Sequence, residues 1–134
     1  MEQADFSRIQ AIQQHIEDTQ YSDFGQNLSA IYDEMVNLNA WKSFTGKMMA
    51  EYKKDLNAKK VEAYNSLIFS QRAAGVNISP SLAKEYINCK CGEMQYLYDF
   101  TERVNNSCAY AIDSLRSILS ALKQELQTLQ YTAQ

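Results

Sequence analysis

Apolar residues recur at helical spacing along most of the chain, and no segment alternates apolar and polar residues as a strand does. Near the N-terminus, one stripe of apolar residues three and four positions apart predicts a helix over residues 3–19. Its members are Phe6, Ile9, Ile12 and Ile16. Polar residues and a glycine at positions 21–25 interrupt this pattern, so we predict a loop there.

A longer apolar stripe follows that loop and reaches about Arg72. Its first members are Leu28, Ile31, Met35 and Leu38. It continues through Trp41, Phe44, Met48, Tyr52 and Leu56, and then through Ala63, Tyr64, Leu67 and Ile68. Asn37 and Asn39 lie between these residues, and asparagine, a poor helix former, can end or bend a helix there. Two interpretations therefore stay open: one helix bent near Asn39, or two separate helices.

The segment 74–80 contains the clearest signals for a turn between helices. Gly75 fits the end of a helix, because glycine adopts a positive φ without strain. Ser79 followed by Pro80 fits an N-cap and the first helical position. We therefore predict a short helix over residues 80–90, and Gly92 then ends or kinks it.

From Glu93 to about Leu129 the chain contains no proline or glycine, and its last part has the most regular pattern. A seam with heptad spacing is formed by Cys108, Ile112, Leu115, Leu119, Leu122, Leu126 and Leu129. This helix would be about 55 Å long at ~1.5 Å per residue, whereas a compact domain of this size is about 28 Å across. We therefore expect part of the seam to project beyond the core and to pair with another copy in a homo-oligomer.

Length and composition agree with this helical pattern. The chain has 134 residues, 46% of them apolar, with 4 glycines and 1 proline. This length suits a single helical domain over residues 1–134, and the scarcity of turn residues favours few, long helices. We predict an all-α bundle of four to five helices with a long C-terminal helix.

The formal net charge is −3, which gives no reason to expect duplex DNA as a partner. Charge is nevertheless uneven, because residues 1–40 are acidic and residues 41–60 are basic. The basic cluster consists of Lys42, Lys47, Lys53, Lys54, Lys59 and Lys60. It is either a solvated helix face neutralised by the acidic segment or a surface that binds phosphate or a nucleotide.

The residues that carry catalysis or metal binding do not form a recognisable motif. Cys89 and Cys91 are separated by one residue, whereas paired zinc ligands usually have two to four between them. Cys108 lies in the apolar seam, where a small thiol packs well. His15 is the only histidine, and we expect it to be solvated or to cap a helix rather than to be catalytic. We predict a non-enzymatic protein without cofactor or metal.

A polar stretch at residues 101–107 lies between two apolar stretches in the middle of the last helix, and the heptad places Thr101 and Asn105 on the seam. One interpretation is a buried asparagine that sets the register of helix packing, or else a solvated turn of the helix. The other is a polar pocket inside an oligomer, in which arginines hold an anion and tyrosines stack on a ring. The candidate ligand-binding residues are Arg103, Arg116, Asn105, Tyr96, Tyr110 and Arg72.

Several runs resemble small helical proteins encoded by bacteriophages. They lie at residues 67–75, 79–87, 102–105 and 111–117, and the resemblance covers about residues 45–130. Such proteins often act by binding: some sequester nucleotide signals of host immunity, others cap a host defence protein, and others assist recombination or assembly. The resemblance implies a location in the bacterial cytoplasm. The odd number of cysteines agrees with this, and no signal peptide or membrane-spanning segment is evident.

These observations support three functional hypotheses. The first is a phage-type accessory protein that sequesters a small nucleotide-like anion at a subunit interface. The alternative is a protein-protein interaction module, in which the acidic first helix with Glu17 and Asp18 docks on a host or phage protein. A nucleic-acid accessory that uses the lysine cluster comes third, because the net charge is acidic.

Overall fold

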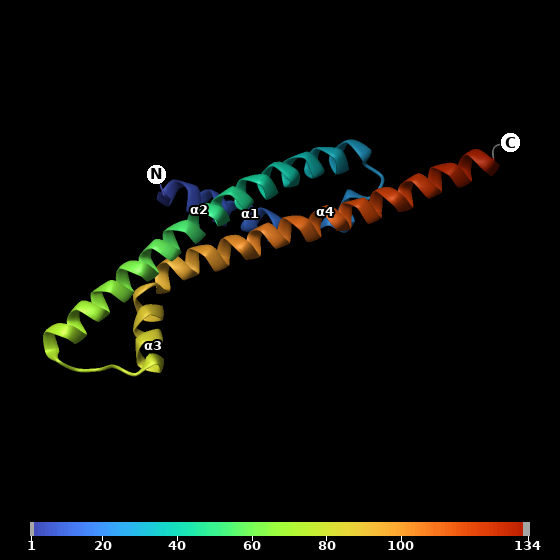
Figure 1. Cartoon of the computed structure of the whole chain (residues 1–134). Coiled ribbons are helices and arrows are strands. Elements are labelled where there is room, and N and C mark those ends of the chain that lie inside the picture. The colour runs from blue at the N-terminus through green and yellow to red at the C-terminus, as the bar shows by residue number, and fades with distance from the viewer. Residues whose placement is uncertain (1, 133–134) are drawn as a thin grey trace. The chain divides into compact units, whose positions relative to one another are not determined.

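The computed structural model describes residues 2–132, except for the side chain of Glu2, and their regular structure is helical throughout. The order is α1 (Glu2–Asp18), the short 3₁₀ helix η1 (Tyr21–Phe24), α2 (Leu28–Ala74), α3 (Pro80–Lys90) and α4 (Gly92–Thr132). Figure 1 labels the four α-helices. The all-α prediction is confirmed, with four α-helices of which α2 and α4 are long.

Most predicted boundaries are confirmed within two residues, and two expectations change. Positions 21–25 contain one turn of 3₁₀ helix instead of an irregular loop, with the Asp23 amide donating to the Gln20 carbonyl. α2 is one continuous helix of 47 residues, so the two-helix interpretation is wrong. Asn39 does not break it, because its side chain donates to the Met35 carbonyl within the helix, 2.9 Å away.

The contacts divide the chain into two compact units. The first unit comprises the chain up to Gly46 and from Arg103 onward, and the second unit is Lys47–Glu102. Both α2 and α4 contribute to each unit. The single domain expected over residues 1–134 stays a prediction.

The first unit packs α1 and the first part of α2 against α4. The apolar residues buried in its core are Ile9, Ile12, Ile31, Leu38, Val104, Cys108, Ala111, Ile112, Leu115, Leu119 and Leu122. The Arg8 guanidinium lies over the Phe44 ring, 4.0 Å from its centre, and adds a cation-π contact between α1 and α2. The heptad seam of α4 is thus covered by this chain over most of its length.

The second unit combines the later part of α2 with α3 and the start of α4. Its buried apolar residues are Met48, Tyr52, Leu56, Ala63, Leu67 and Cys91. Gly75 has a φ of 68° and ends α2, as predicted. The Ser79 hydroxyl accepts a hydrogen bond from the Leu82 amide and Pro80 begins α3, which confirms the predicted N-cap.

Candidate functional site

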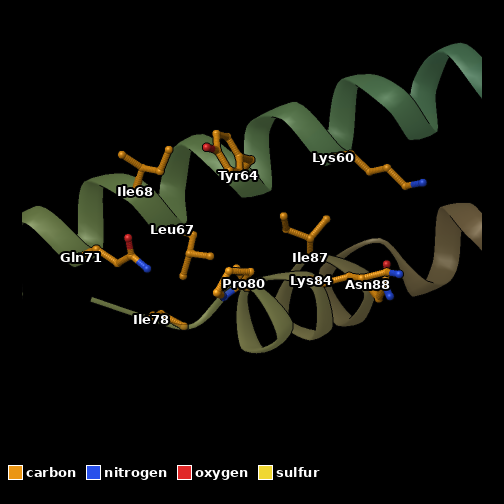
Figure 2. Close-up of a pocket in the computed structure, with 11 residues that line it drawn as sticks. Lys60, Tyr64, Leu67, Ile68, Gln71, Ile78, Pro80, Lys84, Ile87 and Asn88 are labelled. Atoms are coloured by element: carbon orange, nitrogen blue, oxygen red, sulfur yellow. The ribbon is translucent and has the colours of Figure 1, made fainter. Parts of the chain in front are cut away.

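The second unit contains a cavity between α2 and α3 with a volume of about 550 Å³. Figure 2 shows α2 along one side and α3 along the other. The lining residues are Lys60, Tyr64, Leu67, Ile68, Gln71, Ile78, Pro80, Ala83, Lys84, Ile87 and Asn88. This volume lies within the range of about 300–1,000 Å³ that small-molecule sites occupy.

The turn between α2 and α3 creates this cavity. Gly75 and the Ser79–Pro80 cap reverse the chain, so α3 runs back beside α2. No residue of α3 is buried, whereas Leu67 of α2 is 6% exposed. Tyr64 of α2, by contrast, is 50% exposed, so α3 covers only part of this face of α2. The cavity lies where the cover is incomplete, with Leu67 and Ile87 between the two helices (Figure 2).

Two lysines give this apolar cavity a positive charge. Lys60 lies on α2 and Lys84 on α3, and both line the cavity. Among the described side chains of residues 3–132, neither lysine has a carboxylate within ion-pair distance. Lys59, which precedes Lys60, lies 3.7 Å from Glu62. The lining contains no carboxylate, histidine, serine or cysteine. Such a site favours an anion with an apolar portion.

The ligand-binding residues expected from the sequence do not gather in this cavity. Arg103, Tyr110 and Arg116 are exposed on the first unit's part of α4, and the Arg116 guanidinium lies 3.7 Å from Asp113. Arg103 and Arg116 are separated by about 20 Å along the helix and by about 220° around it. One small ligand therefore cannot contact both arginines of one chain.

Asn105 makes a contact inside the first unit. Its amide nitrogen donates to the Lys42 carbonyl (2.9 Å) and to the Thr45 hydroxyl (3.0 Å). Thr45 is fully buried. These bonds join α4 to α2 and favour the interpretation of Asn105 as a residue that sets helix register.

The two remaining candidates lie in the second unit. Arg72 is exposed near the end of α2 and does not line the cavity. Tyr96 is half-exposed at the start of α4 and lines two neighbouring cavities. Sequence analysis missed the α2–α3 cavity itself, although it identified Lys60 in the basic cluster and the turn that brings α3 back.

The expected oligomer seam divides into a covered and an uncovered part. Ile112, Leu115, Leu119 and Leu122 are buried within this chain. Leu126 is 45% and Leu129 is 61% exposed, and both line a small hollow of about 170 Å³ with Leu28. Only this last part of the seam is free to contact another copy, and self-association stays a prediction.

His15 lies in the last turn of α1 with its side chain 41% exposed, and it also contacts α2. Its Nε2 lies 2.7 Å from Oε1 of Glu34, and the edge of the Trp41 indole meets its ring at a centroid distance of 4.9 Å. This cluster joins α1 to α2.

The three cysteines are free thiols, of which Cys89 is exposed while Cys91 and Cys108 are buried. Burial raises the pKa of the Cys108 thiol to about 11, an effect that the positive charge of Lys42 partly offsets. Among the side chains that the structure describes, no three of His, Cys, Asp or Glu are grouped so that they could hold a metal ion.

The acidic side chains of α1 that were expected to dock on a protein are exposed. Glu17 and Asp18 each accept a hydrogen bond from a glutamine four residues earlier, at 2.9 Å.

No helix in the described part of the chain is long and apolar enough to cross a membrane. Comparison with family models, curated proteins and solved structures gives no match. The resemblance to phage proteins therefore stays a prediction.

Proposed function

We propose that this protein is a non-catalytic binding protein that holds a small anion of the nucleotide class in the cavity between α2 and α3. The observation that carries the proposal is the pair Lys60 and Lys84 beside an apolar cavity of about 550 Å³ whose lining has no carboxylate. A phosphate at the lysines gains charge-assisted hydrogen bonds. A ring can lie against Tyr64, Leu67 and Ile87.

This proposal keeps the ligand class expected from the sequence and moves its site. The site expected from the sequence lies between subunits and contains Arg103 and Arg116, whereas the proposed site is a cavity inside one unit with Lys60 and Lys84. Lysine and amide side chains dominate the polar part of the lining, and they are suited to holding a phosphate by hydrogen bonds. In the phage context that the resemblance implies, such a protein would act by sequestration.

Isothermal titration calorimetry with ADP-ribose and cyclic di-AMP tests the proposal directly. We expect micromolar binding by the natural protein and at least a tenfold weaker affinity for the double variant Lys60→Ala/Lys84→Ala, which corresponds to about 1.4 kcal/mol. The matched control is Lys54→Ala/Lys123→Ala, which removes the same charge from exposed positions outside the cavity. Equal losses in both double variants, or no heat with the natural protein, would contradict the proposal.

A further inference from the structure

A second cavity of about 470 Å³ adjoins the first within the same unit. Its lining residues are Lys60, Asn88, Cys91, Gly92, Gln95, Tyr96 and Asp99. Lys60 and Asn88 line both cavities. The ammonium group of Lys60 and the side-chain amide of Asn88 therefore lie at the boundary between the two cavities, and each cavity is large enough for a small ring system.

The two cavities differ in chemistry. The first is mainly apolar, with Leu67, Ile68 and Ile87 in its wall. The second contains the amide of Gln95 and the carboxylate of Asp99, which accepts a hydrogen bond from Gln95 Nε2 at 2.9 Å. A carboxylate repels phosphate and accepts hydrogen bonds from hydroxyl and amino groups. An anionic group is therefore favoured near Lys60, and a sugar hydroxyl or base amino group near Asp99.

Each cavity also has one aromatic side chain with an accessible ring. Tyr64 lines the first cavity and is 50% exposed, and Tyr96 lines the second and is 56% exposed. The Tyr96 ring lies beside Phe100, with ring centres 6.0 Å apart, which limits its freedom. Aromatic side chains of this kind are the surfaces on which nucleic-acid-binding proteins stack bases.

We infer that the two cavities form one bipartite site for a ligand with two ring systems joined by a phosphate or pyrophosphate, that is, a dinucleotide. The linking phosphate lies at Lys60 and Asn88, with one ring on Tyr64 and the other on Tyr96. Asp99 accepts a hydrogen bond from a ribose hydroxyl in the second cavity. This inference rests on the proposed function and specifies the ligand class of the same site.

The structure offers a separate blocking variant for each cavity. A Cβ added at Gly92 would meet nothing within 4 Å, and Gly92 does not have a positive φ, so Gly92→Phe can fill the second cavity without backbone strain. Ala83→Trp fills the first cavity from α3. Ala58→Trp, at an exposed position of α2 outside both cavities, controls for the added indole.

Calorimetry with AMP and diadenosine diphosphate tests the inference, with circular dichroism to confirm that each variant is folded. We expect the natural protein and Ala58→Trp to bind the dinucleotide at least tenfold tighter than AMP. Gly92→Phe and Tyr96→Leu should reduce this preference to less than threefold. Ala83→Trp should weaken dinucleotide binding at least tenfold.

The outcomes separate the inference from the proposed function. If the natural protein binds AMP and the dinucleotide with equal affinity, and Gly92→Phe changes neither affinity, the bipartite site is overturned and the proposed function stands. No binding of either nucleotide would overturn both. Tighter binding of hexaglutamate than of the dinucleotide would also overturn the inference, because the two cavities would then suit an acidic peptide.

Discussion

At the scale of single residues, Glu34 places a carboxylate in the interior of the first unit, where it is 8% exposed. Its observed partner is His15, and the two groups approach to 2.7 Å. The nearby Tyr21 has its pKa raised, first by burial and then by the negative charge of Glu34. A buried carboxylate is costly unless it is hydrogen-bonded, so His15 supports the packing of α1 on α2.

Removal of this histidine should therefore destabilise the protein. We expect His15→Ala to lower the free energy of unfolding by about 1–2 kcal/mol, because Glu34 loses its partner. The double variant His15→Ala/Glu34→Leu should recover part of this loss, since an apolar replacement leaves no unsatisfied polar group. Urea denaturation followed by circular dichroism measures both. Gln14→Ala, at an exposed neighbouring position, is the control, and an equal effect of Gln14→Ala would contradict the prediction.

At the scale of helices, the sequence contains most of the information that sets the boundaries. Gly75, Ser79 and Pro80 act through their own backbone and side chain, so their positions predict the end of α2 and the start of α3. The number of helices before residue 72 could not be decided, because an asparagine can either break a helix or bond within it. Asn39 does the latter through the Met35 carbonyl.

The candidate site was harder to predict than the helices. Its volume depends on how closely α3 approaches α2, and periodicity shows only which face of each helix is apolar. The stripe containing Tyr64 and Leu67 was recognised as helical, yet nothing in it shows that α3 would leave part of that stripe uncovered. The arginines were selected for their chemistry, and the structure places them apart on α4.

Two glycines allow the conformational requirement at the α2–α3 turn to be tested. A Cβ added at either Gly75 or Gly92 meets nothing within 4 Å, but only Gly75 has a positive φ, of 68°. Gly75→Ala should therefore lower stability by about 1 kcal/mol through backbone strain alone. Gly92→Ala should be neutral or slightly stabilising, because alanine is the better helix former. Thermal unfolding of both variants gives the comparison, and equal shifts would contradict this account of the turn.

At the scale of the whole molecule, the heptad seam of α4 has two different environments. Up to Leu122 it is covered by the first unit of the same chain. From Lys123 to Thr132 every residue of the helix is exposed, including Leu126 and Leu129. An exposed apolar seam at the end of a helix is a surface that another protein chain can cover. The exposed end of the seam is therefore where we expect a second copy of the chain to bind.

The covered and exposed parts of the seam allow self-association to be separated from folding. Leu126→Asp/Leu129→Asp should leave the core intact, because both leucines are at least 45% exposed, and should convert a homo-oligomer into a monomer. Leu119→Asp should instead unfold the first unit, because Leu119 is buried at 9% exposure and an unpaired charge there is costly. Native mass spectrometry measures the subunit number at micromolar protein, and circular dichroism measures the helix content of each variant. The native mass spectra also reveal any retained molecule of a nucleotide's mass. A natural protein that is monomeric at this concentration would contradict the prediction of self-association and leave the cavity of the second unit unaffected, since no seam residue lines it.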